Sequence, residues 1–283
     1  MRYLDGEDDH NRQRKAAVIN DFTSFGRCSL AVAIPVLSAM KVQCCPVPTA
    51  FFTNHTGFGS FSWTDNTSRL DDYIVEWKKL GLSFSAIQTG FLGSREQVDF
   101  VLRFVAAFGG EGTVVCVDPV MGDYGRLYAT YDNELATSMK EFLSFADIIT
   151  PNLTEACILA GVPYRTDFTD GELEGICAAL SARNGAKCVI SGIPRGEMLV
   201  NFVYEPGKPH AICAEKKIGA DRSGTGDVFS AVILGDAVNG ADFLSSVRKA
   251  SAFTASAVRR TVEMGLPVKD GLAIEEVLGE LTI

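Results

Sequence analysis

The sequence predicts an α/β fold with a central, mostly parallel sheet, helices on both faces and a small β-hairpin addition. Two observations predict it. Short apolar runs of strand length alternate along the chain with longer segments of helical period, which is typical of βαβ units. Near the C-terminal end, two further strand-like segments flank a Pro-Gly turn at 206–207, which indicates a hairpin with a longer loop.

Each element follows from this alternation. The parallel strands are expected at 16–20, 43–47, 85–88, 113–117, 147–149 and 187–191. These runs are nearly continuous in apolar residues, as strands are when helices bury both faces of a sheet. The intervening helices are expected at 29–40, 67–80, 94–108, 132–144, 153–160 and 171–184. The hairpin strands are expected at 198–204 and 210–215, and three closing helices near 226, 242 and 273.

The length of the chain suits one large domain. Its 283 residues contain 47% hydrophobic and 22% charged residues, which is typical of a globular protein with a sizeable core. No internal repeat or interdomain linker interrupts the pattern. We therefore expect a polar N-terminal tail at 1–14 and a single domain at 15–283.

Charge and hydropathy exclude several classes of partner. The formal net charge of −9 argues against a nucleic-acid partner, which needs a basic stripe, but it leaves a polyanionic small molecule open. No apolar run reaches the roughly 18 residues of a transmembrane helix, so no membrane partner is expected. The N-terminus lacks the apolar core of a secretory signal.

The cysteines indicate a reducing compartment, and the histidines argue against a histidine metal centre. Eight cysteines are scattered along the chain without a C-x-x-C pair, and most lie in apolar runs. Small buried thiols in a reducing cytoplasm account for them better than disulfides or zinc. Three histidines are too few and too dispersed for a histidine metal centre.

Polar, glycine-containing segments follow the predicted strands. They are Asn20-Asp21, Thr89-Gly90-Phe91, 118–123, 150–152 and Ser191-Gly192. In open α/β sheets, ligands bind beyond the carboxyl ends of the strands at a topological switch point. All of these segments fall on that edge, so we expect one site there.

The most informative segment is Gly224-Thr225-Gly226-Asp227, which directly precedes a segment of helical period. Backbone N–H groups at a helix start and the helix dipole favour an anion there. Glycine lets the backbone approach a ligand closely. The same positive end is expected to keep Asp227 ionised near neutral pH, as a general base for a hydroxyl that attacks phosphorus. A glycine turn followed by a helix acid is an equally good interpretation of the four residues alone.

Two further segments carry carboxylates. Asp118 and Asp123 flank a Pro and a Gly after a buried strand, and a tight turn is expected to display both at the sheet edge. Such oxygen ligands suit Mg²⁺, whereas a solvated turn is the competing interpretation. Asn152 and Glu155 have the spacing of a capping box, the interpretation we favour. Alternatively, Glu155 holds a metal-bound water or orients nucleotide phosphates.

Two loops have weaker signals. The segment 53–58 offers hydroxyl, amide and imidazole donors beside Phe51-Phe52, which suits a heterocyclic ligand, although an ordinary solvent loop is the better interpretation in isolation. Lys217 precedes the glycine turn, and we expect it either to reach a nucleotide phosphate or to be solvated. The chain contains no G-x-x-x-x-G-K-[ST] loop, no G-x-G-x-x-G after the first strand and no G-x-S-x-G elbow.

Taken together, these segments resemble the ribokinase superfamily and, within it, the pyridoxal/pyridoxamine kinases. The resemblance is carried, in the family order, by 53–58, 89–91, 117–123, 149–155 and 224–227. Gly-Thr-Gly-Asp marks the superfamily at large, and Asn-His-Thr-Gly at 54–57 favours the vitamin B6 kinases. The resemblance implies a ribokinase-like fold, a homodimer with an open site, and ATP-dependent phosphorylation of the 5′-hydroxymethyl group of pyridoxal, pyridoxamine or pyridoxine.

The resemblance also implies residue roles. Asp227 matches the base, and Gly224, Thr225 and Gly226 match the lining of the hole for the transferred phosphoryl group. Thr56 matches a contact near the pyridine ring. The remaining matches are Asp118, Asp123 and Glu155 for Mg²⁺ and phosphates, and Asn152 and Ser191 for the nucleotide. Mg²⁺ with ATP and a monovalent cation such as K⁺ are usual in the family.

Two positions depart from the family. Asn20-Asp21 stands at the expected substrate-ring contact, where related enzymes have a serine. Phe91 replaces a frequent tyrosine, which keeps a stacking surface but loses a hydroxyl. We hypothesise that Asp21 meets a ring substituent and favours an amine-bearing vitamer. An unchanged ratio of pyridoxamine to pyridoxal turnover in Asp21→Ser would count against this.

Two alternatives remain. Another kinase of the superfamily would act on hydroxymethylpyrimidine or a small sugar, although a sugar site needs more polar side chains than Phe51, Phe52, Phe58 and Phe91 provide. A catalytically silent B6- or nucleotide-binding protein is the alternative from a different class, against which the intact acids and glycine turn argue. ADP release measured across vitamers, pyrimidine alcohols and sugars separates the three.

Overall fold

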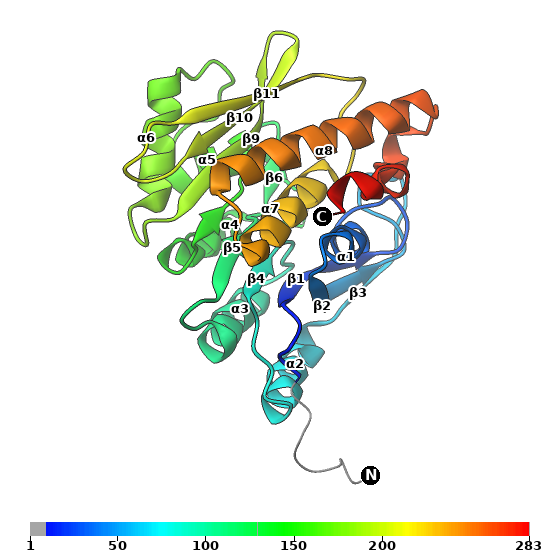
Figure 1. The fold of residues 1–283 in the computed structure, drawn as a ribbon, viewed down its shortest axis with the longest axis vertical. Coiled ribbons are helices and arrows are strands. Elements are labelled where there is room, and N and C mark those ends of the chain that lie inside the picture. The colour runs from blue at the N-terminus through cyan, green and yellow to red at the C-terminus, as the bar shows by residue number, and fades with distance from the viewer. Residues whose placement is uncertain (1–9, 129, 283) are drawn as a thin grey trace.

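A nine-stranded sheet in the order β11-β10-β9-β8-β5-β4-β1-β2-β3 forms the centre of the molecule (Figure 1). The computed structural model describes residues 10–128 and 130–282. The strands are β1 (Lys15–Thr23), β2 (Gln43–Phe52), β3 (Trp63–Asp65), β4 (Ala86–Thr89), β5 (Val114–Val117), β8 (Ile148–Ile149), β9 (Lys187–Arg195), β10 (Met198–Tyr204) and β11 (Ala211–Lys216). From β9 through β8, β5, β4 and β1 to β2 all pairs are parallel, whereas β3, β10 and β11 pair antiparallel. The predicted fold class and hairpin are confirmed.

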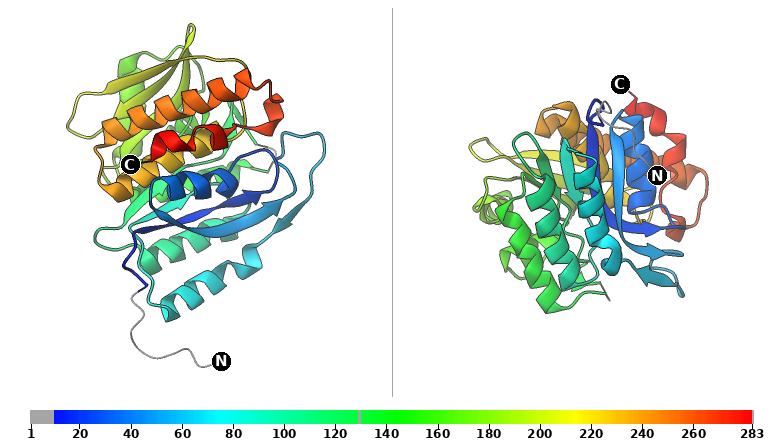
Figure 2. Two further views of the ribbon diagram at one scale, coloured as in Figure 1. Left: turned by 45° about the vertical axis from the view of Figure 1, so that its right-hand side comes forward. Right: turned by 90° about the horizontal axis from the view of Figure 1, so that it is seen from below.

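Helices cover both faces of the sheet. One face carries α2 (Thr67–Lys79), α3 (Arg95–Phe108), α4 (Asn133–Ser138), α5 (Leu153–Ala160) and α6 (Asp170–Ser181). The other carries α1 (Leu30–Ala39), α7 (Thr225–Asn239) and α8 (Phe243–Glu263), as Figure 2 shows. Successive residues of β1 point to opposite faces, so Ala17 and Ile19 join one core and Ala16 and Val18 the other. This double burial explains the continuous apolar runs.

The chain order creates the switch point. From β1 the chain moves outward through β2 and β3, and it then returns to place β4 on the opposite side of β1. The crevice at the carboxyl ends of β1 and β4 is therefore the place where α/β sheets bind ligands. Asn20 and the segment 89–91 lie at that edge.

Three strands were not expected. β3 pairs with the end of β2, which runs on to Phe52 rather than ending at 47. β6 (Gly122–Asp123) and β7 (Arg126–Leu127) form a separate two-stranded hairpin where we expected a tight turn. Strands of two or three residues give no readable alternation, so periodicity does not predict them.

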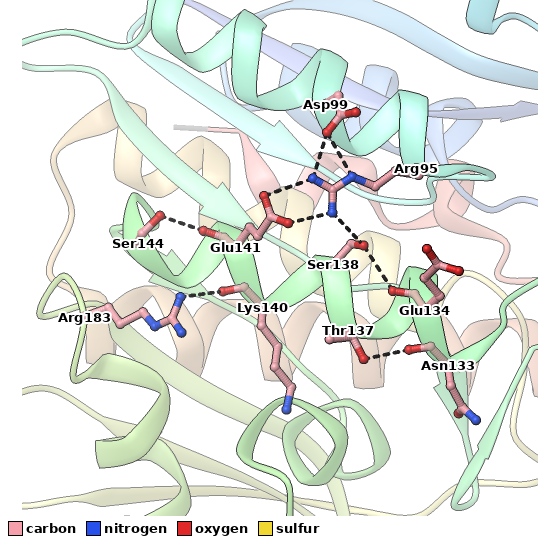
Figure 3. Close-up of polar contacts among 10 residues, drawn as sticks. All are labelled: Arg95, Asp99, Asn133, Glu134, Thr137, Ser138, Lys140, Glu141, Ser144 and Arg183. Carbon is pink, nitrogen blue, oxygen red and sulfur yellow. Dashed lines mark hydrogen bonds and ion pairs between the residues drawn. The ribbon is translucent and has the colours of Figure 1, made fainter.

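The segment predicted as one helix at 132–144 changes geometry at its middle. It begins as α4 and continues as the 3₁₀ helix η1 (Met139–Ser144). Thr137 and Ser138 donate hydroxyl hydrogen bonds to carbonyls one turn back, a contact that bends helices. Figure 3 shows Arg95 of α3 bridging to Ser138 and Glu141. Nη1 of Arg95 lies 2.6 Å from Oε1 of Glu141. This contact ties the segment to α3.

The helix predicted near 273 is wrong. The chain there forms the short 3₁₀ turns η2 (Val268–Asp270), η3 (Ile274–Glu276) and η4 (Leu278–Leu281). The buried residues Ile274, Val277 and Leu281 have the spacing of a helix face, which explains the prediction, but Leu272 is buried as well and the segment is divided into separate short turns. Burial of these side chains against α1 and α8 therefore determines the path.

The N-terminal tail expected at 1–14 is only partly described. Residues 1–9 lie outside the described residues, and 10–14 are exposed. Asn11 nevertheless contacts the body of the protein, because its Nδ2 donates to the carbonyl of Gly81 at 2.9 Å. Within 10–128 and 130–282, no helix combines the length and the apolar character needed to cross a bilayer.

Candidate active site

The glycine turn begins α7 where the sequence predicts. Gly224 has φ 85°, and a Cβ on it would lie 2.0 Å from the carbonyl oxygen of Arg27. Both the positive φ and the close approach require glycine. A Cβ on Gly226 would meet nothing within 4 Å, so the backbone there borders open space. The turn is thus packed on one side and accessible on the other, as an anion cradle needs to be.

Asp227 lies in the first turn of α7, partly buried. Its Oδ1 accepts from Nδ2 of Asn20 at 3.2 Å, and the backbone N–H groups of Ser29 and of Asp227 itself also stabilise its charge. Burial raises the pKa of this carboxyl more than those donors lower it. Desolvation therefore outweighs these hydrogen bonds and the net shift of the pKa is upward. The expectation that Asp227 is ionised near neutral pH stays a prediction.

Asn20 connects the ends of β1 and β4. Its Oδ1 accepts from the backbone N–H of Phe91 at 2.8 Å and of Asp21 at 2.9 Å, which leaves its amide nitrogen directed at Asp227. A Cβ on Gly90 would lie 2.4 Å from Cγ of Asn20. Glycine at 90 therefore makes room for the amide that orients Asp227.

Asp21 is buried beside Asp227. Its two carboxylate oxygens accept from the hydroxyls of Ser29 and Thr23, each at 2.7 Å. Desolvation by burial, with the charge of Asp227 nearby, raises the pKa of Asp21 to about 6. The pairing of β1 with β2 shifts register between Asn20 and Phe22, which places this residue at an irregularity of the strand. Both oxygens are thus already engaged by the protein.

Asp118 lies under the start of α7 rather than on a solvated turn. It is buried, and its pKa is raised to about 8 by desolvation and by the charge of Asp227, against a hydrogen bond from Ser230. The expectation that the turn displays both acids is corrected for this residue. Asp123, in contrast, is exposed on β6, and its Oδ1 accepts from the N–H of Tyr124 at 2.8 Å.

Asn152 and Glu155 form the predicted capping box at the start of α5. Glu155 Oε2 accepts from the N–H of Asn152 at 2.8 Å and Oε1 from the N–H of Met121 at 3.1 Å. Asn152 Nδ2 donates to the carbonyl of Gly122 at 2.8 Å. Burial and the charge of Asp118 raise the pKa of Glu155. The cap therefore ties α5 to the β6–β7 hairpin and places a second buried acid near Asp118.

The predicted metal set is not gathered into one cluster. Within the described ranges, no group of three or more His, Cys, Asp or Glu side chains is arranged to hold a metal ion. Desolvation nevertheless raises the pKa of both Asp118 and Glu155, with a further contribution from the charge of Asp227 on Asp118 and from the charge of Asp118 on Glu155. Hard oxygen donors with unbalanced charge fit a divalent cation that arrives with phosphates.

The predicted nucleotide contacts lie to one side of Asp227. Ser191 in β9 pairs with Asn152 through a parallel bridge. Lys217 forms an ion pair with Asp221 at 3.1 Å. The hydroxyl of Tyr124, at the tip of the β6–β7 hairpin, donates to the same Asp221. Hairpin and pre-glycine loop thus meet beside the crevice.

The predicted ring contacts lie on the other side. Thr56 is exposed on the loop after β2, while His55 anchors this loop by contacting the carbonyl of Lys269 through Nε2 at 2.8 Å. Phe91 packs edge-on against Phe52 and Tyr131, with ring centroids 5.9 Å and 6.1 Å away. The aromatic surface around Phe91 is present, and the role of Thr56 at the ring stays a prediction.

Three residues of the site were missed. Ser29 and Ser230 contact the carboxyl groups of Asp227 and Asp118, and the phenol of Tyr128 has a pKa raised by burial and by the surrounding acids. Only Ser230 had a usable signal, because it follows Asp227 by three positions and shares its helix face. Ser29 and Tyr128 come near the acids only through the tertiary fold.

The fold and site define a class. An acid and a glycine turn at a helix start, at the switch point of a mostly parallel sheet, indicate a phosphotransferase of the ribokinase-like type. The chain belongs to the phosphomethylpyrimidine kinase family, whose model matches residues 34–270. It is 31% identical to the pyridoxal kinase of Arabidopsis thaliana over 231 residues, which cover 77% of this chain and 72% of that protein.

Solved structures agree. A structure from Bacteroides thetaiotaomicron, described as a phosphomethylpyrimidine kinase, is 36% identical with a TM-score of 0.94, covering 97% of this chain and 96% of that one. A second crystal form of that protein contains pyridoxal. The pyridoxal kinase of Lactobacillus plantarum is 28% identical with a TM-score of 0.87, covering 95% and 96%.

Proposed function

We propose that the protein transfers the γ-phosphoryl group of ATP to the 5′-hydroxymethyl group of pyridoxal, pyridoxamine or pyridoxine. The observation that carries the proposal is the position of Asp227, in the first turn of α7 and hydrogen-bonded to Asn20 across the switch point. The pyridoxal kinase of Arabidopsis thaliana and the pyridoxal-containing Bacteroides structure support the choice of substrate.

In the proposed reaction, the vitamer hydroxyl lies between Asp227 and the γ-phosphorus. The raised pKa of Asp227 makes it a better proton acceptor than an exposed aspartate, provided that it is ionised. Asn20 holds the carboxylate in orientation. The backbone of Gly224, Thr225 and Gly226 faces the transferred group, where the positive helix end stabilises its charge.

Mg²⁺ is proposed as part of the Mg·ATP substrate, where it neutralises charge on the phosphates. Asp118 and Glu155, with Asp123 at the rim, are proposed to face it, because buried like charges gain from a cation. Asn152, Ser191 and Lys217 are proposed on the nucleotide side. Thr56 and Phe91 are proposed beside the ring. A monovalent cation such as K⁺ rests on the family resemblance.

Two wider properties remain proposals. A homodimer rests on the family resemblance. A cytoplasmic location is supported by the eight free cysteines, six of them buried, which suit a reducing compartment.

The second candidate function is phosphorylation of a hydroxymethylpyrimidine. The description of the matching family favours it, since that family is named for phosphomethylpyrimidine kinase. Both substrates present a hydroxymethyl group on a flat heterocycle, so the same base and turn serve either reaction.

Release of ADP, measured with purified protein, Mg·ATP and one acceptor at a time, tests the proposal. Pyridoxal, pyridoxamine and pyridoxine are expected to give a higher kcat/KM than hydroxymethylpyrimidine or ribose. A preference for hydroxymethylpyrimidine would select the second candidate, and no release with any acceptor would leave only a binding protein.

A further inference from the structure

A chain of hydrogen bonds links Asp21 to the carboxylate of Asp227. The hydroxyl of Ser29 donates to Oδ1 of Asp21 at 2.7 Å, and the backbone N–H of the same serine donates to Asp227. On the far side, Thr23 donates its hydroxyl to Oδ2 of Asp21, also at 2.7 Å. Asp21 and Ser29 are buried. One serine therefore contacts one acid through its side chain and the other through its backbone.

The backbone of Ser29 is strained. Its φ is 55° and its ψ −137°, in a region that glycine occupies and other residues avoid. Serine at the N-cap of a helix usually accepts a hydrogen bond from the first turn, but here the side chain makes no cap contact with α1. Its hydroxyl is used for Asp21 instead. Glycine would adopt this backbone conformation without strain. Glycine would, however, lack the hydroxyl that Ser29 donates to Asp21.

The neighbouring backbone is held from two sides. A Cβ on Gly224 would lie 2.0 Å from the carbonyl of Arg27, so the loop before Ser29 packs directly on the glycine turn. Arg27 is held in turn by Glu275, at 2.9 Å from Nε. The titratable groups that act on Asp227 or respond to its charge are Asp21 in β1, Cys28 just before α1, Asp118 after β5 and Tyr128 after β7.

We propose that Asp21 is a positioning residue for phosphoryl transfer, which holds the hydroxyl of Ser29 so that the serine amide remains directed at the carboxylate of Asp227. In this proposal Asp21 acts through Ser29, because it is buried and each of its oxygens accepts a hydrogen bond from a protein hydroxyl. The inference rests on the proposed kinase function. It competes with the hypothesis that Asp21 selects an amine-bearing vitamer.

The test compares Asp21→Ala, Asp21→Asn, Ser29→Ala and Ser29→Gly in steady-state assays with pyridoxal. Asp21→Ala and Ser29→Ala should each lower kcat by about 10- to 100-fold, because a catalytic group is misplaced. The KM values for pyridoxal and for ATP should change by no more than about twofold. The double variant should be no worse than either single, because both break one link. Asp21→Asn keeps an acceptor for Ser29 and should retain more activity than Asp21→Ala.

Ser29→Gly separates backbone conformation from hydroxyl chemistry. Glycine adopts φ 55° without strain, so this variant should exceed Ser29→Ala in kcat although both lack the hydroxyl. Thr23→Val is the matched control, since it removes a hydroxyl from the same carboxylate without a link to Asp227, and should stay within about threefold of wild type. Asp21→Asn should also move the acid limb of the kcat/KM profile to lower pH, because a like charge near Asp227 is gone.

The outcomes are distinguishable. Wild-type kcat in Ser29→Ala and Asp21→Ala would overturn the positioning role while the kinase function stands. A changed pyridoxamine-to-pyridoxal ratio in Asp21→Ser, with Ser29→Ala unaffected, would return Asp21 to ring recognition. If Asp21→Ala fails to fold, the order of Ser29→Gly and Ser29→Ala decides alone, and equal losses overturn the proposal. Failure of the wild-type protein to phosphorylate any vitamer would instead reject the proposed function.

Discussion

Asn20 at the end of β1 donates its amide to the carboxylate of Asp227 in α7, with 3.2 Å between Nδ2 and Oδ1, although 207 positions separate them. The same side chain accepts the N–H of Phe91, at the end of β4. One amide therefore joins the two strand ends of the switch point to the helix that carries the proposed base.

Asp227→Asn should lower kcat by about 10²- to 10⁴-fold, the usual value of a general base. The thermal midpoint should stay the same or rise, because burial disfavours the charge that is removed. Coupled ADP release and thermal unfolding measure the two effects. Glu96→Gln, which removes an exposed acid from the first turn of α3, is the matched control. Near wild-type turnover in Asp227→Asn would refute the assigned base.

Gly90→Ala should reduce kcat without unfolding the protein. The added methyl group would lie 2.4 Å from Cγ of Asn20, so the amide must leave its place beside Asp227. Misplacement of this kind costs about 10²-fold in rate. Gly110→Ala, where a Cβ meets nothing within 4 Å, should have wild-type kinetics. The double variant Gly90→Ala/Asn20→Ser tests the cause. Because serine leaves room for the added methyl group, the double variant should lose less kcat than the two single losses combined predict.

Stability in the absence of ligands should fall as pH rises from about 4 to 8. Asp118 has a pKa of about 8 when folded and 3.8 as a free side chain, so over this window the folded protein holds a proton that the unfolded chain has lost. Asp21, with a pKa of about 6, adds to the same trend. Urea midpoints at pH 5 and pH 8 should therefore differ more for the wild type than for Asp118→Asn.

Asp71→Asn, an exposed change on α2, is the control for this pH dependence and should keep the wild-type slope. Equal slopes in Asp118→Asn and wild type would mean that Asp118 is ionised in the folded protein at pH 5. Saturating Mg·ATP should reduce the loss of stability at pH 8, because a cation near Asp118 favours the charged form of its carboxyl group.

His55→Asn should raise the KM for pyridoxal more than the KM for ATP. Nδ1 of His55 accepts the N–H of Gly57 at 3.1 Å, so its Nε2 carries the proton that is donated to the carbonyl of Lys269. Loss of this contact releases the loop that carries Thr56. Steady-state kinetics with each substrate varied in turn measures the split. His210→Asn, on the distant hairpin, should change neither KM, and an equal rise in both for His55→Asn would contradict a role on the ring side.

Local features were predictable from the sequence because they depend on neighbours in the chain. The alternation of strands and helices, the start of α7 after Gly224 and the capping box of Asn152 and Glu155 all appear where the residues indicate. Their physical causes act within a few residues: periodicity, a missing Cβ and a side chain that bonds its own helix start. The closing helix failed as a prediction because its side chains are buried by contacts that are not local.

By itself, the sequence determined the fold class, the edge of the sheet where the polar segments gather and the acid that follows the glycine turn. Only the tertiary structure decided which side chains meet there and what charge they favour. Asn20, Ser29 and Asp227 are brought together by pairing of strands distant in the chain, and desolvation, not the nearby helix end, sets the direction of the pKa shifts of Asp118 and Asp227. Burial depends on everything that packs around a group, and no short stretch of sequence contains that information.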